Sequence, residues 1–193
     1  MENCLHIVFI INGHNGAGKD EFVIQFKKAA EDAGNHYDIS NISTIDLIKQ
    51  MINRPYLWDG KTKDDKSRQL MYDIKEAVDK YNNFSVISTL HRIEAFRLQH
   101  AFVRTVTFVH CREPEKISSL VREIESKYSD KYMVGTILVR RDSDSIAYND
   151  ADQNVENRKY DIYIDNNGTL NDLYEKAKGI VGLCDQLTKM NEE

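Results

Sequence analysis

The sequence has 193 residues, of which 41% are hydrophobic and 30% are charged, and it contains two prolines and no low-complexity tract. This length suits one compact domain over residues 1–193, and the composition excludes a disordered chain. The formal net charge of -5 at pH 7 argues against general attraction to nucleic acid or to an anionic membrane.

The three cysteines, Cys4, Cys111 and Cys184, stand far apart, without a CxxC pair or the histidine spacing of a metal site. We therefore expect reduced thiols in a cytosolic protein. The apolar run at residues 4–11 is too short to cross a bilayer, and it continues into GHNG without a small-residue cleavage site. We expect a cytoplasmic protein, and a monomer and a homodimer both fit the sequence.

The first part of the chain predicts a strand, a helix, a weaker strand and a short helix. Residues 4–12 (CLHIVFIIN) form a near-continuous apolar run that is typical of a central parallel strand covered on both faces. From Asp20 to Gly34 apolar residues recur at helical spacing. The segment 36–43 is a weaker strand candidate, and residues 45–52 form a short helical stretch.

The middle of the chain continues this alternation. Residues 64–81 carry one apolar stripe and predict a long helix. The sequence FSVIST at 84–89 predicts a strand, which is followed by a helical segment near 92–102 and by a strand at 104–111. Pro114 stands where a first-turn proline opens another helix.

The last part predicts a closing strand and a closing helix. Residues 160–165 (YDIYID) predict the strand, and Thr169 caps an apolar stripe that runs to Cys184. Right-handed crossovers then place all strands in one parallel sheet between two layers of helices. The predicted fold is a three-layer α/β/α sandwich, whose ligands bind beyond the carboxyl ends of the strands.

Residues 13–20 read GHNGAGKD, in which Gly13, Gly18 and Lys19 satisfy the phosphate-loop (P-loop, Walker A) pattern GxxxxGK. The match lies between a predicted buried strand and a predicted helix, where backbone N–H groups converge on phosphate oxygens. Glycine permits close approach of the backbone, and the helix N-terminus and the lysine add positive charge. A plain turn is the alternative. We predict that ATP is bound by Gly13, His14, Asn15, Gly16, Ala17, Gly18, Lys19 and Asp20.

The pattern departs from the usual one at Asp20, which replaces the serine or threonine whose hydroxyl binds magnesium. A carboxylate binds the metal directly or through water, so Asp20 is the predicted Mg²⁺ ligand. The predicted strand 84–89 ends in Ser88 and Thr89, where many P-loop enzymes have an aspartate that organises magnesium. Either Asp20 takes over part of that work, or the protein binds nucleotide without efficient turnover.

GxxxxGKD with aspartate in the last position resembles the phage deoxynucleoside monophosphate kinases and the animal-type phosphomevalonate kinases, within the P-loop nucleoside and nucleotide kinase superfamily. The sequence YDIYIDNNGTLNDL at 160–173 resembles the final strand and adenine-side turn of such kinases. The resemblance implies a five-stranded parallel sheet, magnesium-ATP as the phosphoryl donor, and a mobile lid between the fourth strand and the last. It also implies adenine contacts at Asn166, Asn167 and Gly168, for which an ordinary turn is the alternative.

A kinase holds its acceptor in line with the γ-phosphate and neutralises the developing charge, which makes arginines the residues to consider. Arg68, Tyr72 and Lys75 share a polar face of the helix 64–81, at spacings of four and three residues. Arg92 lies near the carboxyl edge of the sheet. We predict that these four residues bind the acceptor, and a solvated helix surface is the alternative.

Residues 126–160 are polar and form the predicted lid, whose closure excludes water and brings guanidinium groups onto the transferring phosphoryl group. Arg140 and Arg141 are the predicted lid arginines, with an exposed edge strand as the alternative, and Arg112 is a third catalytic candidate. Three further polar residues contact acceptor or metal, or belong to a helix surface: Asp150, Asp152 and Asn154.

These features predict an ATP-dependent phosphotransferase. A nucleotide or deoxynucleotide monophosphate kinase fits first, because the phosphate of such an acceptor needs only cationic clamps. A kinase of another small metabolite is the second hypothesis, and a hydroxyl acceptor would need a carboxylate base, for which Asp59 is a candidate. A nucleotide-binding switch or inactive kinase homologue is the third, although the chain has no NKxD guanine-binding motif.

Overall fold

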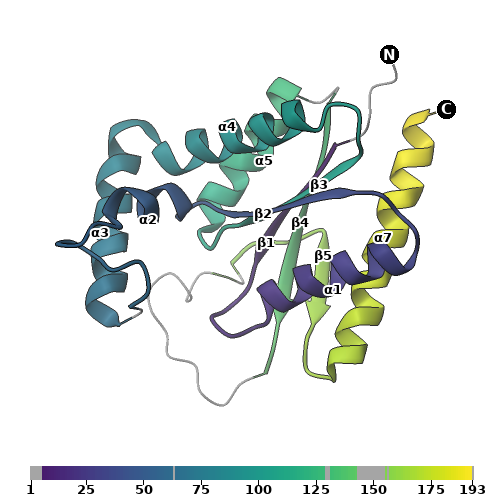
Figure 1. Ribbon diagram of the computed structural model, residues 1–193, viewed down its shortest axis with the longest axis horizontal. Coiled ribbons are helices and arrows are strands. Elements are labelled where there is room, and N and C mark those ends of the chain that lie inside the picture. Colours follow the sequence, from purple (N-terminus) through teal and green to yellow (C-terminus); the bar gives the residue numbers. More distant parts are fainter. Residues whose placement is uncertain (1–5, 63, 129–130, 143–154, 156, 193) are drawn as a thin grey trace.

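The computed structural model describes residues 6–62, 64–128, 131–142, 155 and 157–192. A twisted sheet lies between two layers of helices (Figure 1). The strands are β1 His6–Asn12, β2 Asp38–Ser43, β3 Thr105–His110, β4 Tyr132–Arg140 and β5 Ile162–Asp165. The helices are α1 Lys19–Asp32, α2 Asp46–Ile52, α3 Asp65–Asn82, α4 Phe84–Gln99, α5 Pro114–Tyr128 and α7 Leu170–Glu192.

All five strands are parallel, in the order β2-β3-β1-β4-β5. The predicted α/β sandwich with a five-stranded parallel sheet is therefore confirmed. Strand β1 is central, and its seven residues are all buried. It pairs with β3 on one side and with β4 on the other, so the loop that follows β1 emerges from the middle of the sheet.

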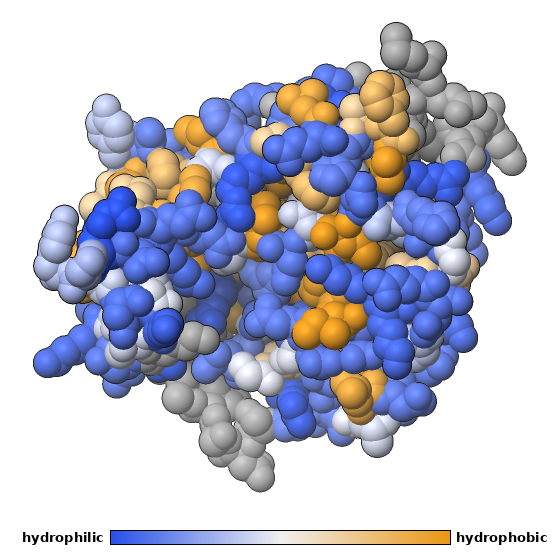
Figure 2. Space-filling view, in the orientation of Figure 1, coloured by the Kyte–Doolittle hydropathy of each residue, from blue (hydrophilic) through white to orange (hydrophobic). Residues whose placement is uncertain are grey.

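The core consists of two apolar clusters, one on each face of the sheet. Helices α1 and α7 cover one face, where Phe22 and Phe26 make edge-on contacts with the ring of Phe108. Helices α4 and α5 cover the other face, through residues such as Leu90 and Leu120. The surface seen in Figure 2 is mainly hydrophilic, with small separate hydrophobic groups, as expected when most apolar side chains lie in these clusters.

The predicted strand at 84–89 is wrong, because these residues begin helix α4. Asn83 has a φ of 55° and turns the chain between α3 and α4. The carboxylate of Asp79 accepts hydrogen bonds from Ser85 N at 2.7 Å and from Ser85 Oγ at 2.8 Å, which caps the start of α4. A cap supplied by the preceding helix thus outweighs the β propensity of FSVIST.

Strand β4, Tyr132–Arg140, lies inside the range 126–160 predicted as a lid, where an edge strand was only the alternative for Arg140 and Arg141. Ile137, Leu138 and Val139 are fully buried beside β1 and β5, so this part of the range belongs to the core. Residues 126–128 belong to the end of α5. The predicted lid is therefore limited to the connection between β4 and β5, in which residues 143–154 and 156 lie outside the described residues.

Cys111 and Cys184 are free and buried, and burial raises the pKa of the Cys184 thiol to about 12. Such thiols are largely inert. Cys4 lies outside the described residues. None of the helices that the structure describes is long and apolar enough to cross a membrane.

His6 makes the stability of the fold depend on pH. Its Nδ1 lies 2.8 Å from Thr105 Oγ1, and burial lowers the His6 pKa to about 4, assisted by Arg97 and opposed by Glu94. Below pH 6.5 the unfolded chain binds this proton while the folded chain does not, so stability falls with pH down to about 4. We expect a loss of about 1–2 kcal/mol between pH 7.5 and pH 5 from this residue.

Urea unfolding at both pH values, compared between the wild type and His6→Gln, checks this expectation. The glutamine variant does not titrate, so its stability should change less over the same interval. Equal pH dependence of the two proteins would show that His6 is not responsible.

Candidate phosphate-binding site

The residues of the GxxxxGK pattern form the loop between β1 and α1. The register of β1 places Ile11 beside His110 of β3 and Asn12 beside Leu138 of β4. The carboxyl ends of three parallel strands therefore meet where the loop begins. This is the edge at which ligands bind in sheets of this kind.

The backbone of the loop requires glycine at two positions. Gly13 has a φ of 149°, and a Cβ there would collide with the carbonyl oxygen of Val139 in β4. Gly18 has a φ of 93°, and a Cβ there would collide with the side-chain amide of Asn166. Gly16 also has a positive φ, of 79°, but has open space around it. The loop is thus packed tightly at both ends and open at its tip.

The start of α1 has the features of an anion site. Gly18 is the N-cap residue and supplies no side-chain cap, so the first-turn N–H groups are not satisfied in the usual way. The Nζ of Lys19 donates to Gly13 O at 2.6 Å and to His14 O at 2.8 Å, which places the ammonium over the loop. A helix N-terminus and a cation therefore converge on one small volume.

Asn12 connects the loop with two neighbouring segments. Its Oδ1 accepts a hydrogen bond from Gly13 N at 2.7 Å, and its Nδ2 donates to Arg112 O at 3.1 Å and to Tyr160 Oη at 2.7 Å. Tyr160 Oη in turn donates to Val155 O at 2.8 Å. Neither Asn12 nor Tyr160 was predicted to belong to the site, although an asparagine at the end of the apolar run 4–12 was a signal for such a role.

Asn166 braces the loop from the other side. Its Nδ2 donates to Ala17 O at 2.9 Å and its backbone N donates to Arg140 O at 2.6 Å. The turn predicted to bind adenine, Asn167 and Gly168, follows directly. The amide of Asn167 bonds Asp142 through its Oδ1 at 2.7 Å and its Nδ2 at 2.9 Å, which joins this turn to the end of β4. The turn and the phosphate loop are therefore linked through Asn166, while adenine binding stays a prediction.

Asp20, the predicted metal ligand, projects from the first turn of α1, and 87% of its side chain is exposed. Its Oδ1 lies 3.6 Å from Nε2 of His110, the last residue of β3. Burial lowers the His110 pKa, while the carboxylate of Asp20 opposes that effect. The oxygen donors of Asp20 suit Mg²⁺. Among the described residues, no group of three or more acidic, histidine or cysteine side chains can hold a metal ion.

The strand end at which an aspartate was expected is not at Ser88 and Thr89, which are buried in helix α4. Strand β3 ends beside the loop, and His110 is its last residue. A histidine thus stands where a carboxylate was looked for.

Arg92, a predicted acceptor ligand, lies in α4 and reaches the end of β2. Its guanidinium donates to Asp46 Oδ2 at 3.0 Å and to Ser43 O at 3.3 Å. Asp46 also accepts from Ser43 N at 2.7 Å. A cavity of about 520 Å³ is lined by Leu47, Asn82, Phe84, Ile87, Ser88, His91, Arg92 and Ala95. It lies between α2 and α4, and no residue of the loop 13–20 lines it.

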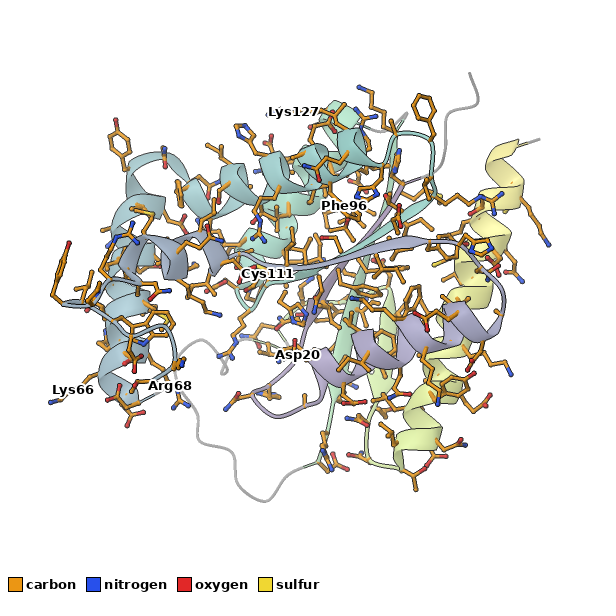
Figure 3. The ribbon with its side chains drawn as sticks, in the orientation of Figure 1. Asp20, Lys66, Arg68, Phe96, Cys111 and Lys127 are labelled. Atoms are coloured by element: carbon orange, nitrogen blue, oxygen red, sulfur yellow. The ribbon has the colours of Figure 1, made fainter. Side chains whose placement is uncertain are left out.

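The other predicted acceptor ligands are not brought together at this edge. Arg68 pairs with Asp65 at 3.3 Å and is 54% exposed, and Figure 3 shows it at the outer end of α3, away from Asp20. Tyr72 is exposed on the same helix. Lys75 is buried, and its ammonium lies 3.2 Å from both Asp79 and Glu113. In this structure Lys75 thus faces protein carboxylates.

We expect Lys75→Met to lower the free energy of unfolding by about 2–3 kcal/mol, because it removes one cation from the buried carboxylate of Asp79 and the partly buried carboxylate of Glu113. Burial alone would lower the Lys75 pKa, but Glu113 and Asp79 outweigh it and raise the pKa. Lys116, 3.1 Å from Asp79, limits the loss. Urea unfolding measures the change, with exposed Lys80→Met on the same helix as the control. An unchanged stability with a raised KM for an acceptor would instead make Lys75 a substrate ligand.

The three predicted catalytic arginines differ in their surroundings. Arg140 ends β4, and its guanidinium lies 4.7 Å from the centre of the Tyr163 ring, a cation–π arrangement. Arg141 is exposed. Arg112 follows β3, and its carbonyl accepts from Asn12. The remaining candidates of the predicted lid, Asp150, Asp152 and Asn154, lie outside the described residues.

Asp59, the candidate base for a hydroxyl acceptor, is a turn residue in this structure. Its carboxylate accepts from Lys61 N, Thr62 N and Thr62 Oγ1 at 2.6–2.8 Å. These hydrogen bonds, above all those from Thr62, lower the Asp59 pKa to about 2. A carboxylate with this pKa is a weak general base near neutral pH.

No protein-family model and no curated protein matches this chain. Among solved structures, an APS kinase from Mycobacterium tuberculosis is 12% identical, covers 96% of this chain and 99% of its own, and gives a TM-score of 0.45. A gluconokinase from Sinorhizobium meliloti 1021 is 11% identical, with 98% and 96% covered and a TM-score of 0.39. These likenesses concern the fold alone, and the resemblance to phage nucleotide kinases and phosphomevalonate kinases stays a prediction.

Proposed function

We propose that this chain is an ATP-dependent phosphotransferase with a small phosphorylated acceptor, of which a nucleoside or deoxynucleoside monophosphate is the first candidate. The observation that carries the proposal is the loop 13–18 at the end of the central strand. There an uncapped helix N-terminus and the ammonium of Lys19 converge, and the backbone requires glycine at Gly13 and Gly18. Polyphosphate is the ligand class that such a loop suits.

The roles of the side chains follow from this placement. Lys19 would contact the β and γ oxygens of ATP, and Asp20 would bind the accompanying Mg²⁺, which neutralises charge on the phosphates. Arg92, near the end of β2, is the acceptor ligand favoured by its position, since Lys75 is engaged elsewhere. Arg112, Arg140 and Arg141 remain the proposed cations for the transferring phosphoryl group. Asn167 and Gly168 remain the proposed adenine contacts.

A hydroxyl acceptor is the second candidate, and one observation favours it. Asp46 stands three residues after β2. Its negative charge is one of those that raise the pKa of His110 at the end of β3, against the effect of burial. Its carboxylate is held by Arg92 and by Ser43 N, so its position is defined. A positioned carboxylate can accept the proton of an attacking hydroxyl group. Asp46 thus replaces Asp59 as the proposed base for this class of acceptor.

The test is magnesium-dependent formation of ADP from ATP with panels of nucleoside monophosphates, phosphorylated metabolites and polyols. We expect turnover with a member of the first panel. Turnover with a hydroxyl acceptor that Asp46→Asn abolishes would favour the second candidate. ATP binding without turnover on any panel would support a nucleotide-binding switch, and a folded protein with no affinity for magnesium-ATP would reject the proposal.

A further inference from the structure

We propose that the divalent cation accompanying the nucleotide is bound by Asp20 together with Nε2 of His110, so that the site prefers Mn²⁺ or Co²⁺ to Mg²⁺. The inference rests on the proposed function, because the cation would enter the site with the nucleotide. It concerns a residue, His110, that the phosphate-loop pattern does not include.

The two donor atoms are spaced as two ligands of one cation. The distance from Asp20 Oδ1 to His110 Nε2 is 3.6 Å. Two ligands about 2.1 Å from one ion are about 3.0 Å apart at a right angle and about 4.2 Å apart in line. The observed spacing lies between these limits. The exposed carboxylate of Asp20 can adjust to the ion, since 87% of its surface is free of protein.

His110 is fixed by the sheet at the edge where phosphates would bind. In the register of the sheet, His110 lies beside Ile11, and Ile11 precedes Gly13 by two residues. Its carbonyl accepts from Thr44 N at 3.1 Å, and Cys111 N donates to Ile11 O at 3.2 Å. Figure 3 labels Asp20 and Cys111, the residue after His110. Strand β3 thus carries the imidazole to the start of α1.

The His110 ring can bind a cation through Nε2 once its proton lies on Nδ1 and the Asn41 amide has turned away. Nε2 lies 2.8 Å from Asn41 Oδ1, and the tautomer with the proton on Nε2 donates a hydrogen bond to that oxygen. Cation binding moves that proton to Nδ1 and leaves the Nε2 lone pair for the metal. Asn41 is exposed, so its amide can turn to water.

The donor types determine which cation is preferred. Mg²⁺ takes oxygen ligands in a strict octahedron, whereas imidazole suits first-row transition metals. Two protein donors cannot hold an ion alone, in agreement with the absence of a three-ligand cluster among the described residues. The phosphates and water complete the coordination shell. Cation binding is therefore expected to depend on nucleotide.

The experiment compares the wild type with His110→Gln, His110→Asp and the control His91→Gln, a histidine exposed on α4. Fluorescent ADP binding in EDTA first measures nucleotide affinity without metal. Titration of the protein–ADP complex with Mn²⁺ and with Mg²⁺ then gives the ratio of the affinities of the complex for the two cations. This ratio is compared with the same ratio for ADP free in solution. Electron spin-echo envelope modulation of the bound Mn²⁺ detects a nitrogen ligand directly.

We expect nitrogen coupling in the wild type and in His91→Gln, and none in His110→Gln or His110→Asp. The ratio favouring Mn²⁺ should fall at least about tenfold in His110→Asp, which supplies a carboxylate in place of the imidazole. Bound ADP with no nitrogen coupling in the wild type and equal ratios in all variants would overturn this inference while leaving the proposed function standing. A folded wild type that binds no ADP under any condition would overturn both.

Discussion

Lys19→Ala is expected to lower kcat/KM for phosphoryl transfer at least about 100-fold, as the loss of one group stabilising charge in a transition state commonly does. The physical reason is the position of its ammonium, 2.6 Å from Gly13 O and 2.8 Å from His14 O, directly over the loop. The variant also loses these two hydrogen bonds. Steady-state kinetics with the acceptor identified by the substrate panel measures the effect.

The matched control is Lys28→Ala, which removes an exposed lysine of the same helix, whose Nζ lies 5.2 Å from the centre of the Tyr174 ring. Its kinetics should equal those of the wild type. Lys19→Ala should unfold at a lower urea concentration than Lys28→Ala, because only Lys19 donates hydrogen bonds to the loop carbonyls, but it should remain folded at the concentrations used in the assay. Unchanged kcat/KM in Lys19→Ala would reject the assignment of the loop.

Gly13→Ala should destabilise the protein by about 2–4 kcal/mol and abolish nucleotide binding, because a Cβ is incompatible with both the backbone and its neighbour. The φ of 149° is unfavourable for alanine, and the Cβ would collide with Val139 O. That carbonyl belongs to β4, which pairs with β1 and β5, and it therefore cannot move away cheaply. Urea unfolding measures the stability, and titration with ADP measures the binding.

Substitutions of two other glycines distinguish the cost of the atomic collision from the cost of the unfavourable φ angle. Gly16→Ala meets a φ of 79° but no neighbouring atom, so it should cost only about 1 kcal/mol. Gly179→Ala lies in α7 with open space and should stabilise the protein by up to about 1 kcal/mol. If Gly13→Ala is no more destabilising than Gly16→Ala, the close contact with Val139 is not a constraint.

Local patterns predicted most of the fold, and they failed where a distant contact decides the structure. The apolar run of β1 and the apolar stripes of α1 and α3 are visible in the sequence of each segment alone. The start of α4 cannot be recognised in this way, because it is capped by Asp79 of the preceding helix. Strand β4 was only an alternative prediction because it stands between two polar stretches, although the apolar run Ile137 to Val139 was visible.

In the candidate site, too, residues within a contiguous motif were predicted and contacts between distant residues were not. A contiguous motif encodes the loop 13–20, so its glycines and Lys19 were found from the sequence. The braces Asn12, Tyr160 and Asn166 come from segments about 150 residues apart and meet only in the folded sheet. Lys75 was predicted to bind the acceptor from a polar helix face, because helical spacing cannot show that Glu113 of the loop before α5 lies against it.

The place of β1 in the sheet has a consequence for how the chain acquires its structure. This strand is synthesised before β3 and β4, yet it pairs with residues about 100 and about 125 positions later, such as Thr105 and Tyr132 for His6. During synthesis both edges of this apolar strand stay unpaired until β3 and β4 have left the ribosome. Such long-range pairing slows folding and exposes the nascent strand to aggregation. Maturation of the phosphate loop must therefore be a late event, because its conformation depends on Val139 and Asn166.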